Sequence, residues 1–274
     1  MLVEATLVDS PAPRVVRTLV VLGDSVGVGI GDPALGGGWR GFAPMLAEAM
    51  GEPRLVNLAV SGARVASVRG AQLPAAVAAQ PDAAVLVVGM NDTMRSDFDP
   101  VQLCADLDRM VTALLSVGSA VVAVRYHDHS RIFRLPGPLR RMFTGRITQF
   151  NKTLDVVVAR HRIGVVDLHG LPTTYERSCW AVDRLHPSEI GYRMLARAFA
   201  QRFAEAGLAI PAEVSADCSG GREIKTWQHI FWLIFMGIPW LCRRGRDLVP
   251  HALATIIRNA LAGPDAPEPA EEYS

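Results

Sequence analysis

Short runs of apolar residues rich in Val, Leu and Ala recur between residues 18 and 168. None of these runs alternates cleanly between apolar and polar positions. Continuous apolar runs of this length are typical of strands that are buried on both faces of a parallel sheet. The pattern therefore predicts strands at residues 18–22, 54–59, 83–88, 119–124 and 163–168.

The longer segments between these runs carry apolar residues at helical spacing. Asp99 followed by Pro100 marks the start of one such segment, because Asp caps a helix and Pro fits its first turn. Helices are expected at residues 39–50, 99–117, 139–160 and 188–206. The alternation of strand and helix predicts a three-layer α/β fold with right-handed crossovers. Ligands of such folds bind beyond the carboxyl ends of the strands, so site residues should directly follow strands.

The character of the chain changes at about residue 214. We expect a catalytic domain at 1–212, an apolar and basic helical extension at 213–262, and a disordered, Pro-rich acidic tail at 263–274. Within the extension, residues 227–241 are apolar nearly all round but too short to span a membrane.

Three interpretations of this apolar segment stay open. It packs back on the core, or it forms a lid or dimer contact, or it lies at a membrane interface. In the last case Arg243, Arg244 and Arg246 would contact lipid headgroups. Peripheral membrane contact or dimerisation is thus assigned to residues 227–246.

Composition narrows the functional class. The chain has 274 residues, of which 50% are apolar, and a formal net charge of only +1. A large core can be buried, and no overall field favours a nucleic-acid partner. The 4 cysteines form no CxxC pair, so neither a zinc site nor a disulfide scaffold is indicated. The N-terminus shows no signal peptide, which favours a cytoplasmic location, with membrane association as an option.

Candidate chemistry follows the first three predicted strands. Ser25 stands in Gly23-Asp24-Ser25, where a strand-to-helix turn would expose its hydroxyl. The start of the next helix would also offer unpaired N–H groups there. Gly62 would let the backbone approach a substrate, and the Asn91 amide, in Gly89-Met90-Asn91-Asp92, can donate to an oxyanion. Taken singly, each piece also fits an ordinary turn or cap.

A fourth piece precedes the last predicted helix. Asp183 and His186 stand three residues apart in Asp183-Arg184-Leu185-His186-Pro187. On one helical turn they would face the same way, so Asp183 could hold one ring nitrogen of His186 while the other reaches Ser25. An exposed Asp–His pair is the alternative.

Together and in this order, the four blocks resemble those of the SGNH (GDSL-like) hydrolase family over about residues 17–207. The stretch GDPALGGGWRGFAPMLAE after the serine is also similar to that of actinobacterial members. One departure is Val26-Gly27 where many relatives have Leu-Thr, which would alter the floor of the pocket.

The resemblance implies a flavodoxin-like, three-layer α/β/α fold with a five-stranded parallel sheet, followed here by the C-terminal helical extension. It implies Ser25 as nucleophile, His186 as general base and acid, and Asp183 as its orienting carboxylate. The oxyanion hole would comprise the Ser25 and Gly62 N–H groups and the Asn91 amide. No cofactor or metal ion is implied.

Substrate preference is less well indicated. We expect Asp24, Trp39, Arg125, His127 and Cys179 at the rim of the pocket. Six arginines between residues 125 and 146 suggest an anionic substrate or an anionic membrane surface, or simply a solvated basic face; they are Arg125, Arg131, Arg134, Arg140, Arg141 and Arg146. His127 and His129 lack the further acidic ligands that a metal site needs.

The sequence thus favours a serine-dependent carboxylic-ester hydrolase acting on a small-molecule or lipid acyl ester. Two alternatives stay open. One keeps the site for an acyltransferase or thioesterase in a biosynthetic pathway, and the other is a non-catalytic binding or membrane-scaffold protein.

Overall fold

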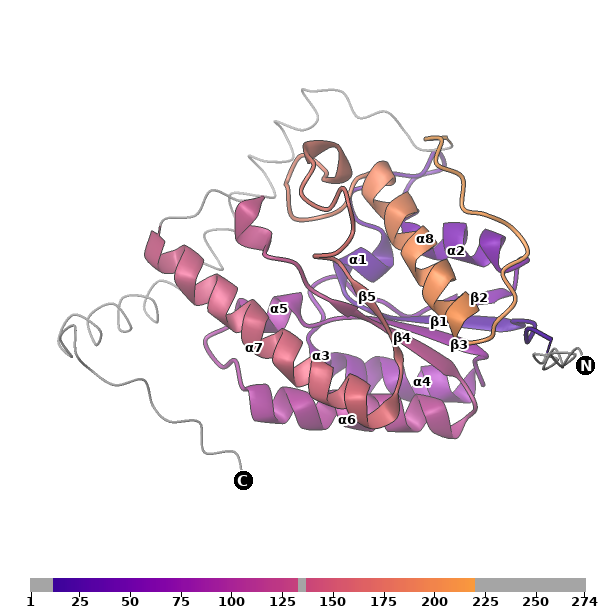
Figure 1. The fold of residues 1–274 in the computed structure, drawn as a ribbon, viewed down its shortest axis with the longest axis horizontal. Coiled ribbons are helices and arrows are strands. Elements are labelled where there is room, and N and C mark those ends of the chain that lie inside the picture. Colours follow the sequence, from indigo (N-terminus) through magenta and orange to yellow (C-terminus); the bar gives the residue numbers. More distant parts are fainter. Residues whose placement is uncertain (1–11, 133–136, 220–274) are drawn as a thin grey trace, which may run out of the picture.

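A computed structural model describes residues 12–132 and 137–219 of the chain. Its centre is one sheet of 5 parallel strands in the order β2-β1-β3-β4-β5 (Figure 1). The strands are β1 (Thr18–Gly23), β2 (Arg54–Asn57), β3 (Ala83–Val87), β4 (Ala120–Arg125) and β5 (Gly164–Asp167). This is the flavodoxin-like order, and the expected three-layer α/β/α fold is confirmed.

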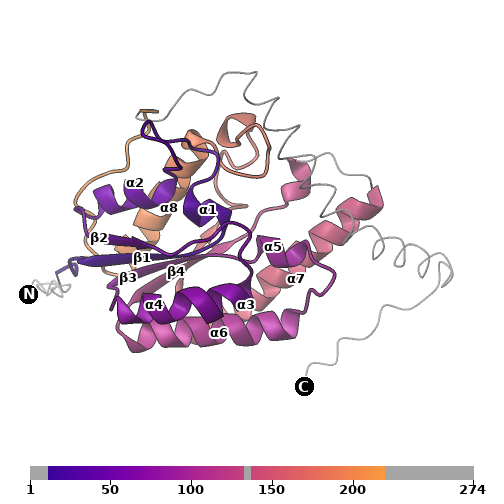
Figure 2. The same cartoon turned by 180° about the vertical axis from the view of Figure 1, so that it is seen from behind.

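Helices cover both faces of the sheet. The helices are α1 (Ser25–Val28), α2 (Phe42–Ala49), α3 (Val65–Ser67), α4 (Leu73–Ala78), α5 (Met90–Thr93), α6 (Pro100–Ser116), α7 (Gly137–His161) and α8 (Glu189–Glu205), with short turns η1 (Val68–Gln72), η2 (His129–Arg131) and η3 (Arg177–Cys179). Helices α1, α2 and α8 lie on one face, and α3, α4, α6 and α7 lie on the other (Figures 1 and 2). The crossovers thus wrap the sheet into three layers.

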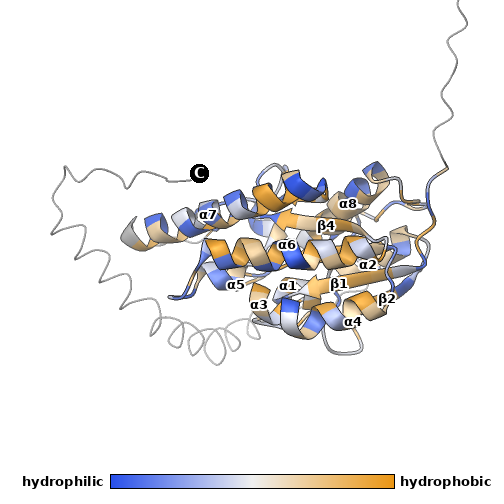
Figure 3. Ribbon diagram, turned by 90° about the horizontal axis from the view of Figure 1, so that it is seen from below, coloured by the Kyte–Doolittle hydropathy of each residue, from blue (hydrophilic) through white to orange (hydrophobic). Residues whose placement is uncertain are grey.

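The core explains the continuous apolar runs. Every residue of β3 is buried, and β1 is buried from Leu19 onward, because both strands lie inside the sheet under helices on each face. Edge strand β2 is only half-buried. In Figure 3 the strands are mostly hydrophobic, whereas the helices carry both colours. The cost of desolvating the strand backbones is offset by ladder hydrogen bonds and by apolar burial.

The predicted helices all form, with small changes at their ends. The Asp99 side chain accepts the N–H groups of Val101 and Gln102 and caps α6 as expected. Helix α2 starts at Phe42 and not at residue 39, because Gly41 takes a positive φ of 67° immediately before it. Strand β2 stops at Asn57, whose side chain accepts the N–H of Ala59 and turns the chain.

The chain after α8 returns along that helix. Val214 is buried, and the carbonyls of Val214, Ser215 and Ser219 accept hydrogen bonds from Arg197 and Arg193 of α8. Residues 213–219, which we expected to open the extension, therefore pack on the catalytic body. The rest of the predicted extension, including 227–246, and the tail at 263–274 lie outside the described residues.

No helix within the described ranges combines the length and apolar character needed to cross a membrane.

Candidate active site

The nucleophile candidate sits where β1 passes into α1. Ser25 is the first residue of α1, and the Asp24 side chain accepts the N–H of Val26 at 3.0 Å, which caps this short helix. A Cβ at Gly23 would lie 2.1 Å from the carbonyl oxygen of Val87 on β3. Only glycine permits this close approach, so the residue before Asp24 is restricted by packing and not by chemistry.

Ser25, His186 and Asp183 form a continuous chain of hydrogen bonds. The Ser25 hydroxyl lies 2.9 Å from Nε2 of His186, and Nδ1 of His186 lies 2.6 Å from an Asp183 carboxylate oxygen. The structure thus brings together the three side chains that the sequence singled out, although Ser25 is separated by 161 residues from His186.

The local geometry of Asp183 and His186 differs from our expectation. They lie on a loop before α8 and not on a helical turn, and Arg184 between them has a positive φ of 53°. The second Asp183 oxygen accepts the backbone N–H groups of Leu185 and His186 at 2.9 and 3.0 Å. The aspartate therefore both bends the loop and holds the imidazole, which is the turn chemistry available to a short carboxylate.

The charge on Asp183 is stabilised by this arrangement. Burial alone would raise the pKa of Asp183, but the hydrogen bonds from the ring and N–H of His186 and from Leu185 bring its pKa below the usual value. An ionised Asp183 keeps the proton of His186 on Nδ1. Nε2 is then available to accept the Ser25 hydroxyl proton.

Two backbone N–H groups and one side-chain amide are the candidate oxyanion donors. Within the described residues, no acceptor takes the N–H of Ser25 or of Gly62. Gly62 has a φ of +78° and open space beyond its Cα, so its turn tolerates glycine far better than other residues. The Asn91 amide donates to the carbonyl of Ala63 at 3.1 Å, which fixes it beside the Gly62 turn. This cluster has the composition of an oxyanion hole.

Asp92 is a residue of the site region to which the sequence analysis gave no role. Its buried carboxylate accepts the N–H of Val65 at 3.1 Å and the Arg64 guanidinium at 3.2 Å. It thereby joins helix α5, which carries Asn91, to the segment after Gly62. Its position directly after Asn91 in the sequence could have identified it as a residue of the site.

Asp24 is buried and not at a rim. Burial raises the pKa of Asp24 to about 6, and the nearby Asp92 carboxylate also raises it, while the N–H of Val26, His186 and the Asn91 amide lower it. One Asp24 oxygen accepts the Asn91 amide at 3.3 Å. Asp24 is therefore a positioning residue that orients Asn91.

Asp24→Asn tests this burial through the pH dependence of stability. The folded pKa of about 6 lies above the ordinary value of 3.8, so the stability contributed by Asp24 falls as the pH rises from about 4 through 6. Near neutral pH the free energy of unfolding of the wild type has fallen by about 3 kcal/mol through this group. Asn does not titrate, so the variant has no such loss. The Tm of the variant minus that of the wild type, measured by circular dichroism, is expected to increase between about pH 4 and pH 7. A difference that stays constant over this range would contradict the assignment.

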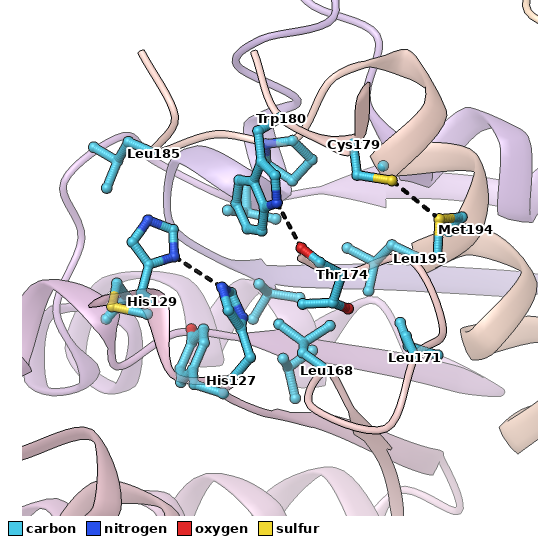
Figure 4. A pocket seen from close by; sticks show the side chains of 17 residues that line it. His127, His129, Leu168, Leu171, Thr174, Cys179, Trp180, Leu185, Met194 and Leu195 are labelled. Carbon is cyan, nitrogen blue, oxygen red and sulfur yellow. Dashed lines mark hydrogen bonds between the residues drawn. The ribbon is translucent and has the colours of Figure 1, made fainter. Parts of the chain in front are cut away.

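A cavity of about 70 Å³ opens beside the site. His127 and Cys179 line it, and both are buried (Figure 4). Val26, the departure noted in the sequence, also lines it. Of the rim residues that we expected, Asp24, Trp39 and Arg125 do not line this cavity.

Three of the described arginines between residues 125 and 146 have partners within the protein. Arg125 pairs with Asp155 at 3.1 Å and with Asp167 at 3.4 Å, and buried Arg146 donates to the carbonyls of Thr93 and Arg95. Arg131 stacks on the ring of Tyr175 at 3.6 Å. Arg134 lies outside the described residues. These contacts make Arg125, Arg131 and Arg146 less available to an anionic substrate, whereas Arg140 and Arg141 are exposed.

Within the described ranges, no group of three or more His, Cys, Asp and Glu side chains is arranged to hold a metal ion. Asp128 accepts the N–H and hydroxyl of Ser130 and caps η2. His127 and His129 contact each other instead, with ring nitrogens 2.9 Å apart.

The chain is similar to known proteins in its sequence and in its fold. The sequence profile of the GDSL-like lipase/acylhydrolase family matches residues 21–194. No curated protein matches the chain.

Solved structures share the fold. LAE5, an alpha/beta hydrolase from the metagenome of Lake Arreo, is 22% identical with a TM-score of 0.55, over 69% of this chain and 95% of its own. Axe2, an acetylxylan esterase from Geobacillus stearothermophilus, is 20% identical with a TM-score of 0.55, over 68% and 94%. A lipase/acylhydrolase from Enterococcus faecalis is 22% identical with a TM-score of 0.54, over 69% and 96%.

Proposed function

This chain belongs to the GDSL-like lipase/acylhydrolase family, and from that premise we propose that it is a serine-dependent carboxylic-ester hydrolase. Ser25 is the nucleophile, His186 the general base and acid, and Asp183 the orienting carboxylate. The reaction passes through an acyl-enzyme on Ser25. Its substrate is a small-molecule or lipid acyl ester.

The observation that carries the proposal is the hydrogen-bonded chain from Ser25 through His186 to Asp183. Its links of 2.9 and 2.6 Å lie within the range for a nucleophile, its base and the group that orients the base. These three side chains lie at the carboxyl edge of the parallel sheet, where folds of this class bind ligands.

The acylation step follows from this geometry. Ser25 Oγ attacks the ester carbonyl carbon while Nε2 of His186 takes the hydroxyl proton. The carbonyl oxygen becomes an oxyanion that the N–H groups of Ser25 and Gly62 and the Asn91 amide stabilise. Ionised Asp183 stabilises the imidazolium that forms.

The two remaining proton transfers use the same imidazole. When the tetrahedral intermediate collapses, the carbon–oxygen bond to the alcohol breaks and His186 returns its proton to the leaving alkoxide. His186 then deprotonates a water molecule, which attacks the acyl carbon and releases the acid and the free Ser25 hydroxyl.

The ester class is tested with p-nitrophenyl acetate, butyrate, octanoate and palmitate. Release of p-nitrophenol by the purified full chain, with the leaving group constant, reports both turnover and acyl-chain preference. Failure of all four esters while a fluorophosphonate still labels Ser25 would point to an acyltransferase or a narrower natural substrate. Failure of turnover and labelling together would leave the non-catalytic scaffold interpretation.

Asn91→Ala is expected to lower kcat for p-nitrophenyl ester hydrolysis by about 10²- to 10³-fold with a small change in KM. In the free protein the Asn91 amide donates to Ala63 and Asp24. It donates to the oxyanion only when that group forms in the transition state, so ground-state binding is affected little. Steady-state kinetics on the best ester measure both parameters.

Asn151→Ala is the matched control for this variant. Asn151 is equally buried and makes two hydrogen bonds to the backbone of Tyr126. Its loss should lower the Tm without a comparable fall in kcat. A similar fall in kcat for both variants would show that the Asn91 effect is structural.

A further inference from the structure

The cavity beside the triad is built from residues adjacent to the catalytic ones. Val26 follows Ser25, Met90 precedes Asn91, and Leu185 precedes His186, and all three line the cavity. Figure 4 shows Leu185 at one side and Leu168, Leu171 and Leu195 at the other. A group attached to an acyl carbon on Ser25 would therefore have this space next to it.

His127 is one of several polar side chains in this mainly apolar lining. His127 is only 2% exposed, and its ring packs against Trp180 at 5.1 Å and against Tyr175 at 5.8 Å. These contacts fix the plane of the imidazole. The indole N–H of Trp180 is already used, because it donates to the Thr174 carbonyl at 2.6 Å.

The protonation of the His127 ring follows from its neighbours. Nε2 of His129 lies 3.0 Å from the Arg184 carbonyl, which accepts only, so this nitrogen carries the proton. Nδ1 of neutral His129 is then an acceptor, and Nε2 of His127, 2.9 Å away, must donate to it. The remaining His127 nitrogen, Nδ1, therefore carries a lone pair and no proton.

Both imidazoles are neutral at physiological pH. Burial lowers the pKa of His127 to about 2, and the neighbouring His129 and His169 act in the same direction. Burial also lowers the pKa of His129 to about 4, although the Arg184 carbonyl and Asp183 oppose this. Each ring therefore carries one proton, as the tautomers deduced from the hydrogen bonds require.

His127 Nδ1 is buried and has no hydrogen-bond partner among the described residues. Buried acceptors are nearly always satisfied in native proteins, because an unsatisfied one loses its hydration without compensation. His127 lines the cavity next to the nucleophile, so the simplest partner for this acceptor is a donor on a ligand bound there.

We propose that the cavity is an acyl subsite for short acyl groups that carry a hydroxyl, which donates a hydrogen bond to His127 Nδ1. This inference rests on the proposed ester hydrolysis at Ser25 and specifies its acyl class. A volume of about 70 Å³ is roughly half of the 150 Å³ cavity known to hold benzene, so about three non-hydrogen atoms fit beyond the carbonyl. Two carbons and one hydroxyl oxygen meet that limit.

Two pairs of methyl esters of equal size test the proposal. Butanoate is compared with 3-hydroxypropanoate, and 2-methylpropanoate with 2-hydroxypropanoate. Each pair differs only by a methyl group in place of a hydroxyl. Acid release by the wild-type chain is followed in a pH-stat, and each kcat/KM is divided by the rate constant of that ester with hydroxide, which removes differences in intrinsic reactivity.

In at least one pair, the hydroxylated ester is expected to have the higher normalised kcat/KM by about 10-fold. A hydroxyl that gains no partner there would instead be penalised for desolvation. Ratios at or below one in both pairs would overturn the proposal, including the case in which an ordered water satisfies His127.

His127→Phe provides the second readout. Phe keeps an aromatic ring between Trp180 and Tyr175 but removes the acceptor, so the preference should reverse in favour of the methyl-bearing ester. The variant must retain fluorophosphonate labelling of Ser25, which shows that it is folded. A preference that survives in folded His127→Phe would also overturn the proposal. Absence of any turnover dependent on Ser25 in the wild type would instead refute the proposed function itself.

Discussion

Ser25→Ala is expected to reduce kcat for p-nitrophenyl ester hydrolysis by about 10⁶-fold. The Ser25 hydroxyl is the group that becomes bonded to the acyl carbon, and its hydrogen bond to His186 at 2.9 Å is the route by which it loses its proton. Alanine removes the nucleophile and leaves the binding groups in place. Initial rates measured at high enzyme concentration give the residual activity.

Ser116→Ala is the matched control for this substitution. Ser116 is exposed at the end of α6, on the face of the sheet opposite to α8 (Figure 1). It should retain wild-type kcat. Residual activity of Ser25→Ala above about one part in a hundred would mean that another group attacks the ester.

Asp183→Asn is expected to reduce kcat by about 10⁴-fold while the protein stays folded. The carboxylate oxygen 2.6 Å from Nδ1 of His186 accepts a proton that only one imidazole tautomer carries. An amide NH₂ in that position favours the other tautomer, which places a proton on Nε2. His186 then cannot take the proton of Ser25.

Asn is chosen because it preserves the loop. Its oxygen still accepts the N–H groups of Leu185 and His186, which bend the chain at this point. Asp183→Ala removes both functions and should lower the Tm as well as kcat. If Asp183→Asn loses less than about 10-fold in kcat and keeps its Tm, the orienting role of Asp183 is wrong.

Much of the fold was predictable because buried strands and helix starts have recognisable sequence patterns. Residues 83–88 are apolar without alternation because β3 is buried on both faces. The dipeptide Asp99-Pro100 marks the start of α6, because Asp caps the helix and Pro fits its first turn. The strand positions also predicted which residues would lie together in the candidate site. Ser25, Gly62 and Asn91 each follow a strand, and parallel strands end at one edge of a sheet.

The details that could not be predicted depend on contacts between distant residues. The pair Asp183 and His186 suggested a helical turn, because spacing alone cannot distinguish that from a loop bent by the aspartate itself. Arg125 is the last residue of β4 and was expected at the rim of the pocket, yet Asp155 and Asp167 pair with it. Nothing in the spacing of His127 and His129 indicated which nitrogen would be left without a partner.

Asp24 illustrates the same limit in the catalytic motif. Its position beside Ser25 suggested a rim residue, but its burial and its contact with Asn91 depend on residues that are distant in the sequence. The three carboxylates of the region have different environments. Asp183 is held ionised by donors, whereas burial raises the pKa of Asp24 to about 6 and raises that of Asp92 as well.

Covalent labelling tests most directly whether Ser25 is an activated nucleophile. The wild-type chain is incubated with a fluorophosphonate, digested, and analysed by mass spectrometry to locate the adduct. We expect a single phosphonyl adduct on Ser25, with much slower labelling in Asp183→Asn. No adduct, or an adduct on another serine while Ser25 stays unmodified, would contradict it.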